Sequence, residues 1–159
     1  MRRFFFFLAM VVAAPGLASA DGLAGREGWQ VMPATKSFAV LNEDLDSAIK
    51  AEGMLLVTQA SASAGARGRG LTISGNRIVG VYRNDYAVRM LEASVAAGIE
   101  APIRFYVTEN GDGTATLSWK TPGFVFAPYS SEGGAALAEL AAELDSVFQA
   151  IASRAVAPK

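Results

Sequence analysis

Cysteine and histidine are both absent from this chain of 159 residues. Without histidine, the chain has no side chain that titrates near neutral pH when unperturbed, no Ser-His-Asp relay and no imidazole to bind zinc, copper or haem. Without cysteine, it has no disulfide, no thiol nucleophile and no thiolate ligand. These absences remove the commonest tools of enzyme chemistry. They favour a non-catalytic protein that uses no cofactor and no metal.

An excess of positive charge is lacking too, because 14 basic residues face 15 acidic ones. Proteins that bind nucleic acid use clustered lysine and arginine to neutralise a row of phosphates, and this sequence has no such block. The composition therefore argues against nucleic acid as a partner. The length lies within the range of a single domain.

The first 20 residues carry the three parts of an export signal: a basic start at residues 1–3, an apolar run at residues 4–14 and an Ala-Ser-Ala site at residues 18–20. The apolar run is shorter than the ~20 residues that span a bilayer. We therefore expect a signal peptide that is cleaved after Ala20, a mature protein without a transmembrane anchor, and a periplasmic or secreted location.

The first half of the mature chain predicts a leader, a strand and a helix in that order. Residues 21–35 are polar and aperiodic, which indicates an irregular leader segment. Lys36 to Leu41 is an apolar run typical of a strand, and Asn42 to Asp44 provides an asparagine cap followed by acidic residues, typical of a helix start. The helix that follows is expected to bury Leu45, Ala48 and Ile49 and to end at Gly53.

The middle of the chain predicts two more strands and a second helix. Residues 54–58 and 77–82 are short apolar runs typical of strands, and residues 60–75 between them indicate a loop or a short helix. Asn84 and Asp85 are then expected to cap a helix that ends at Gly98. Its predicted buried stripe consists of Val88, Leu91 and Val95.

The last third contains the clearest patterns. Apolar and polar residues alternate over 103–108 and again over 114–120, around a glycine-rich turn, which predicts a β-hairpin. A long helix is expected over 132–154, capped by Ser130 or Ser131. The predicted fold is a single α+β domain over 36–155, with a mostly antiparallel sheet and helices packed on one face. The stripe expected to cover the sheet consists of Leu137, Leu140, Leu144, Val147, Phe148 and Ile151.

Three segments, Ile78 to Asn84, Ala101 to Val107 and Trp119 to Tyr129, resemble the family called domain of unknown function 302, in its secreted branch. The resemblance implies a layering of sheet and helices similar to that of the TATA-binding protein, often as a homodimer, and no established reaction. Many members have Gly-Asn-Pro at the junction between strand and helix. This chain has Arg-Asn-Asp there, so that only Asn84 matches.

The segment after the hairpin offers a candidate ligand site. Its aromatic residues follow the strand that carries Lys120, and apolar walls with a lysine and a tyrosine hydroxyl at the rim would suit a small amphiphilic or anionic ligand. The start of the second helix could face the same region, since a helix N-terminus favours anions. The alternative is that the aromatics pack in the core and Asn84 only caps a helix. The candidate ligand-binding residues are Arg83, Asn84, Lys120, Phe124, Phe126 and Tyr129.

Two other functions remain open at this point. One is a serine hydrolase or acyl-transferase that uses Ser47 and Lys50, because S-x-x-K, Ser74-Gly75-Asn76 and Lys120-Thr121-Pro122-Gly123 follow the order of the motifs in penicillin-binding enzymes. Against it, Pro122 interrupts the third motif and removes a backbone donor. The other is a structural homo-oligomer in which an exposed face of the sheet pairs with a second copy.

Overall fold

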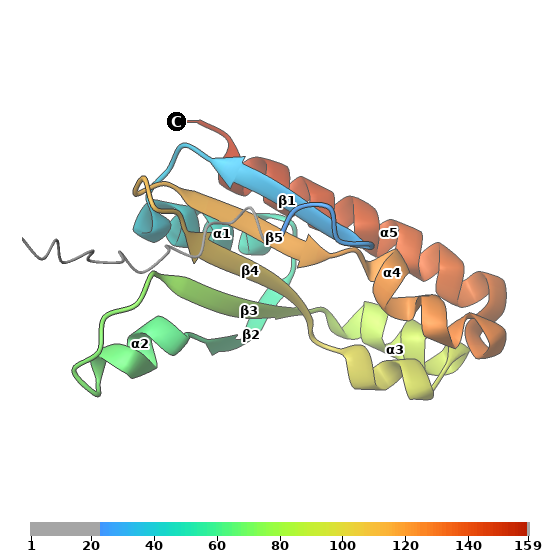
Figure 1. Cartoon of the computed structure of the whole chain (residues 1–159). Coiled ribbons are helices and arrows are strands. Elements are labelled where there is room, and N and C mark those ends of the chain that lie inside the picture. Colours follow the sequence, from blue (N-terminus) through green and yellow to red (C-terminus); the bar gives the residue numbers. More distant parts are fainter. Residues whose placement is uncertain (1–22, 159) are drawn as a thin grey trace, which may run out of the picture.

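Five antiparallel strands form one sheet in the order β1-β5-β4-β3-β2 (Figure 1). The computed structural model describes residues 23–158, so the predicted signal peptide lies outside the described residues. The strands are β1 (Trp29–Ala34), β2 (Leu55–Ala60), β3 (Asn76–Tyr82), β4 (Ile103–Glu109) and β5 (Ala115–Lys120).

The helices lie mainly on one side of this sheet, where α1 and α5 pack together behind the strands (Figure 1). The predicted α+β class with a long C-terminal helix is therefore confirmed. The α-helices are α1 (Phe38–Ala51), α2 (Ala62–Arg67), α3 (Asn84–Ala93), α4 (Pro122–Phe126) and α5 (Ser130–Val156), and the 3₁₀-helices are η2 (Ala96–Glu100) and η3 (Ala127–Tyr129).

The core lies between the sheet and α5. Alternate residues of a strand point to opposite faces, so Phe105 and every second residue of β4 on either side of it point toward the helices. The ring of Phe105 stacks on Phe148 of α5 with centroids 4.6 Å apart, and it lies 5.6 Å from the ring of Trp119 on β5. The predicted stripe of α5 is buried apart from Val147, which is half-buried.

The predicted leader is wrong in its second half, because residues 29–34 form β1 and pair with β5. Pro33 obscures this strand in the sequence. Proline cannot donate a ladder hydrogen bond, which confines it to edge strands, and β1 is an edge of this sheet. Gly28 precedes the strand with φ of 71° and accepts a hydrogen bond from the Thr121 amide.

The predicted strand at 36–41 is also wrong, because α1 begins at Phe38. Ser37 is its N-cap, and the Ser37 hydroxyl accepts a hydrogen bond from the amide of Val40. Leu41 is fully buried and extends the apolar stripe of α1 by one turn. Short apolar runs do not distinguish strand from helix by periodicity, and the stripe shared with the later turns decides for helix. Asn42, expected as a cap, therefore lies inside the helix.

The expected face and end of α3 are wrong as well. Arg83 is the N-cap and forms no capping hydrogen bond with its side chain, while Asn84 is the first helical residue. Tyr86 and Met90 are the buried residues, because a spacing of four places them on one face against α5. The helix ends at Ala93, before Gly98. The predicted stripe is exposed, with exposed fractions of 45% for Val88, 46% for Leu91 and 78% for Val95.

The remaining predicted elements are confirmed: β2, β3, the β4–β5 hairpin and a short helix, α2, between β2 and β3. Gly53 ends α1 in the left-handed conformation expected of a glycine at that position. Over residues 23–158, no helix has the length and apolar character required to cross a bilayer.

Candidate functional site

The side of the sheet away from α1 and α5, here called the outer face, presents two rows of side chains across the strands. In the first row, Trp29 on β1 pairs with Lys120 on β5, and Arg104 on β4 pairs with Gly80 on β3. Phe105 pairs with Trp119 on the opposite face, so the adjacent residues Arg104 and Lys120 lie side by side on neighbouring strands. The second row runs through Val31, Ser118, Tyr106, Ile78 and Ala60.

A hollow of about 570 Å³ lies over these rows. Trp29, Arg104 and Lys120 line one end of the hollow. Tyr106 and Ile78 line its middle, because they lie on the central strands of the second row. The other end, here called the apolar end after its two alanines, is lined by Ala60 and Ala62 and by the polar side chain of Asn76.

The apolar end is formed by the step from β2 into α2. Ser61 caps α2, and its hydroxyl accepts a hydrogen bond from the Ala64 amide. The Asn76 side chain accepts a 2.8 Å hydrogen bond from the Ala62 amide, which fixes the start of α2 against β3. Small side chains at Ala60 and Ala62 keep this end of the hollow free of bulk.

The charged end is closed by the segments before β4 and after β5. Tyr129 donates a 2.7 Å hydrogen bond from its hydroxyl to Oε1 of Glu100, and Glu100 and Val125 line the hollow. The Glu100 carboxylate beside it raises the pKa of the Tyr129 hydroxyl above its usual range, because the hydrogen bond favours the neutral phenol. Tyr129 therefore joins α4 and η3 to the wall of the site.

Two cations and one acid define the electrostatics of the charged end. The Lys120 ammonium lies 6.0 Å from the centroid of the Trp29 ring. Neither Arg104 nor Lys120 forms an ion pair with any residue between 23 and 158. Among the described residues that line the hollow, Glu100 alone carries a carboxylate. The charged end is therefore net positive.

Three of the six predicted site residues lie in or beside the hollow. Lys120 lines the hollow directly, and Tyr129 reaches it through Glu100. Phe124 is 38% exposed, and its ring lies against Gly28, the residue before Trp29. A Cβ atom at Gly28 would meet Cγ of this ring at 2.0 Å, which shows how closely the two segments pack.

The other three predicted residues lie elsewhere. Phe126 is 3% exposed and belongs to the core. This agrees with the alternative interpretation, in which the aromatic residues pack in the core. Arg83 stacks over Tyr86 at 4.0 Å, donates two hydrogen bonds to the Asp85 carboxylate and lowers the pKa of that carboxyl. With Phe126 it lines a separate cavity of about 30 Å³, too small for a metabolite. Asn84 is exposed and lines neither space.

Sequence reasoning missed Trp29, Arg104, Tyr106, Ile78 and Glu100 as residues that line the hollow. The alternation over 103–108 had placed Arg104 and Tyr106 on the polar face of β4, which was a usable signal. Trp29 carries no such signal, because the polar and aperiodic segment around it predicts a leader. The row that joins it to Lys120 exists only through the pairing of β1 with β5.

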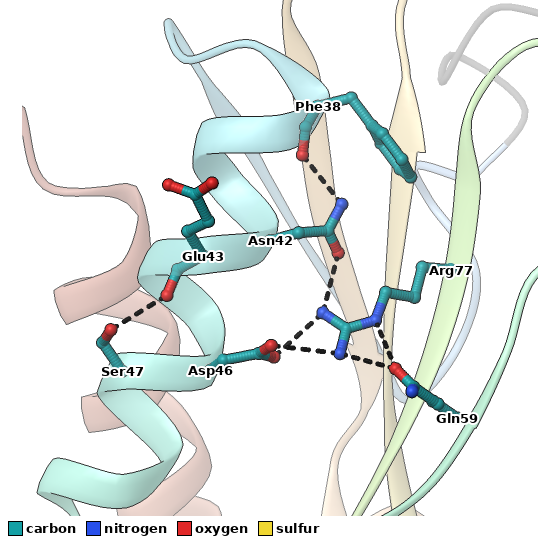
Figure 2. Close-up of polar contacts among 7 residues, drawn as sticks. All are labelled: Phe38, Asn42, Glu43, Asp46, Ser47, Gln59 and Arg77. Atoms are coloured by element: carbon teal, nitrogen blue, oxygen red, sulfur yellow. Dashed lines mark hydrogen bonds and ion pairs between the residues drawn. The ribbon is translucent and has the colours of Figure 1, made fainter.

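The three hydrolase motifs do not come together. Ser47 is exposed on α1, and its hydroxyl donates a 2.9 Å hydrogen bond to the Glu43 carbonyl one turn earlier (Figure 2). Lys50 is also exposed on α1, within the helix layer. Lys120 lies on the outer face, so the sheet separates the first motif from the third.

The polar cluster beside Ser47 is a structural contact. The guanidinium of Arg77 on β3 donates two hydrogen bonds to the Asp46 carboxylate, at 2.9 and 3.1 Å, and further bonds to the side-chain oxygens of Asn42 and Gln59 (Figure 2). These bonds join α1 to β3 and β2. The guanidinium of Arg77 is thus held by side chains of both the helix and the sheet, which accounts for the cluster without a ligand. Within residues 23–158, acidic side chains do not gather into a candidate metal site either.

Comparisons with known proteins agree with this architecture. The sequence matches the family described as domain of unknown function DUF302 over residues 30–151. The structure is similar to the crystal structure of an uncharacterized conserved DUF302 protein from Bacillus stearothermophilus, with a TM-score of 0.72 and 21% sequence identity. The similarity covers 82% of this chain and 99% of the other one. No curated protein matches the sequence.

Proposed function

The chain belongs to the family described as domain of unknown function DUF302, and we propose that it is an exported, non-catalytic module that binds a small amphiphilic or anionic ligand in the hollow of the outer face. The observation that carries this proposal is the hollow itself. Its volume of about 570 Å³ lies within the range of roughly 300–1,000 Å³ that small-molecule sites occupy. Its walls combine aromatic and aliphatic side chains with a few charged groups, which is the composition of a binding pocket.

The proposal that the module is non-catalytic rests on what lies at the site. Nucleophilic catalysis requires a nucleophile with a base in hydrogen-bond reach. Among the residues that the structure describes, no serine or threonine lines the hollow, and the chain has no cysteine or histidine. Lys120 and Arg104 are placed to attract a charge on a ligand. We therefore propose that the site serves recognition.

The proposed export rests on residues 1–20 of the sequence. Their basic start, apolar run and small-residue site are the features that an export machinery recognises. Production of the full chain in a Gram-negative host, followed by intact-mass measurement of the periplasmic fraction, tests this part. We expect a protein whose mass corresponds to residues 21–159. A product that keeps residues 1–20 and stays in the cytoplasm would contradict export.

Native mass spectrometry of the periplasmic protein tests the binding function. We expect a small molecule to remain bound to the wild-type protein and to be lost from the Ala62→Trp variant, whose indole would fill the apolar end of the hollow. Ala62 is exposed, so we expect the fold to tolerate this change. The matched control is Ala136→Trp, at an exposed position of α5 that does not line the hollow. Equal loss of the molecule from both variants would refute the hollow as its site.

A structural homo-oligomer is the second candidate, and the β2 edge of the sheet favours it. All six residues of β2 are exposed, among them Leu55 and Val57 at 59% and 47%. Edge strands with exposed apolar side chains can pair with another chain. Light scattering of the wild type and of Val57→Lys tests the candidate. A dimer that the lysine dissociates would support it, and a wild-type monomer at working concentration would exclude it.

A further inference from the structure

We infer that the ligand of the hollow is an amphiphile with a single negative charge, whose head group lies between Arg104 and Lys120 and whose apolar chain crosses Tyr106 and Ile78 toward Ala60. This inference rests on the proposed binding function and names the class of ligand. It follows from the opposite character of the two ends of the hollow.

The charged end favours an anion. Arg104 and Lys120 lie side by side on neighbouring strands, and like charges directly opposite each other destabilise a sheet. No described residue forms an ion pair with either of them. A carboxylate between the two side chains would remove this repulsion, because the guanidinium offers a pair of parallel donors and the ammonium offers a third.

Glu100 limits the charge of the head group. Its carboxylate lines the same hollow as the two cations. Arg104, Lys120 and Glu100 together therefore give this end a net charge of one positive unit. A monoanion neutralises that charge, whereas a dianion would leave an excess of negative charge beside Glu100. The hydrogen bond from Tyr129 keeps the Glu100 carboxylate at the wall.

The apolar end determines the rest of the ligand. Ile78 is 41% exposed on the outer face although it is a large aliphatic side chain, and it lies in one row with Tyr106 and Ala60. Contact with an apolar chain would remove this surface from water. Arg104 and Ala60 are two strands apart and two residues apart along the strands, which corresponds to about 12 Å. This span suits an unbranched chain of medium length.

Calorimetric titration tests the inference on the protein that is produced with residues 1–20 and purified from the periplasm. Three probes are used, each below its micellar concentration. Decanoate carries both charge and chain, decanol carries the chain alone, and acetate carries the charge alone. We expect decanoate to bind at least about tenfold more tightly than decanol, since a hydrogen bond to a charged group contributes more than a neutral one. Acetate should bind too weakly to measure, because it lacks the contacts with Tyr106 and Ile78.

Variants then identify the two ends. Arg104→Gln and Lys120→Gln should each weaken decanoate about tenfold and leave decanol unchanged. Ala60→Phe should shorten the preferred chain, so that hexanoate gains relative to decanoate. The matched control is Arg154→Gln, which removes one positive charge from α5 in the helix layer and should change neither affinity. Thermal unfolding of each variant verifies that the fold is retained.

The outcomes separate the inference from the function on which it rests. If decanol binds as tightly as decanoate and the glutamine variants bind both like the wild type, the anionic head group is refuted while the hollow remains a binding site. If neither probe binds and Ala62→Trp has lost no bound molecule in native mass spectrometry, the proposed function fails and the inference fails with it. If Arg154→Gln weakens decanoate binding as much as Arg104→Gln and Lys120→Gln do, the effect comes from the net charge of the protein. That result would overturn the proposed site.

Discussion

Phe148 on α5 stacks on Phe105 on β4, with ring centroids 4.6 Å apart and ring planes inclined by 20°. Both side chains are almost completely buried. Phe105 also contacts Trp119 on the adjacent strand, so one side chain joins the hairpin to the long helix. The stack is therefore a direct contact between α5 and the centre of the sheet.

Phe148→Ala should therefore lower the free energy of unfolding by about 3–5 kcal/mol, because it removes buried surface and leaves a cavity. Urea denaturation followed by tryptophan fluorescence measures the change. Phe124→Ala is the control, since Phe124 is 38% exposed and its truncation should cost clearly less. Equal losses from the two variants would show that the stack is not a principal contact.

Arg77→Met should lower the free energy of unfolding by about 1–2 kcal/mol, because it deletes hydrogen bonds between charged and polar groups. The Arg77 side chain is 15% exposed, while Asp46 is 44% exposed and can regain water when its partner is lost. Arg154→Met serves as control, because it breaks an ion pair whose arginine is 58% exposed and should cost less than about 1 kcal/mol. Chemical denaturation compares the two variants, and a larger loss from Arg154→Met would contradict the structural role of Arg77.

Stability should depend on Tyr129 at alkaline pH. The hydrogen bond to Glu100 raises the pKa of Tyr129 in the folded state, so its contribution to stability is fully present below the pKa of the unfolded state, about 10, and is lost as the pH rises through the folded value. The difference in unfolding free energy between the wild type and Tyr129→Phe should therefore be constant near neutral pH and shrink at alkaline pH.

Spectrophotometric titration provides the second readout for this pair. Glu100→Gln should shift the tyrosinate transition of Tyr129 to lower pH, since a neutral amide replaces the carboxylate that favours the neutral phenol. Tyr129→Phe should remove that transition. A titration curve that Glu100→Gln leaves unchanged would contradict the proposed effect of Glu100.

Gly80→Ala should destabilise the protein by about 1–3 kcal/mol through overpacking. A Cβ atom at Gly80 would lie 2.2 Å from Oγ1 of Thr58 and 2.8 Å from Cγ of Pro102, so neighbouring atoms must move. Thr58→Ala should restore part of the loss in the double variant, which a double-mutant cycle detects. Gly65→Ala, inside α2 with no atom within 4 Å of the added carbon, should be neutral or stabilising. Failure of Thr58→Ala to interact with Gly80→Ala would contradict the contact.

Ser47→Ala should leave the thermal unfolding temperature unchanged within about 2 °C, because the residue is exposed and its hydroxyl bonds only to its own helix. We also expect no labelling of the wild type by a fluorophosphonate or a β-lactam probe. Labelling that disappears in Ser47→Ala would instead favour the hydrolase hypothesis.

Elements with a strictly periodic sequence pattern were predictable. Elements whose bounds or buried face depend on packing against other parts of the chain were not. The hairpin and α5 follow from alternation and from the 3–4 spacing of residues such as Leu137, Leu140 and Leu144. For α3, two apolar stripes compete in the sequence, and only packing against α5 selects Tyr86 and Met90. The N-terminus of α1, with Ser37 as its N-cap, lies in a short apolar run that fits a strand as well as a helix. Only packing decides between the two.

The site was predictable to the extent that it depends on the hairpin. Lys120 was identified from the polar face of its strand, and Tyr129 from the segment that follows. The adjacency of Arg104 and Lys120 and the contribution of Trp29 depend on strand register and on the β1–β5 pairing. These are non-local relationships, which no spacing along the chain reveals.

The alternation along β4 has an evolutionary consequence. The candidate site residues Arg104 and Tyr106 occupy one side of this strand, and the core residues Phe105 and Val107 occupy the other. Changes at positions such as Arg104, Tyr106 and Lys120 can therefore accumulate without loss of foldedness. A scaffold of this kind can acquire new specificities one substitution at a time, while its interior stays under separate selection.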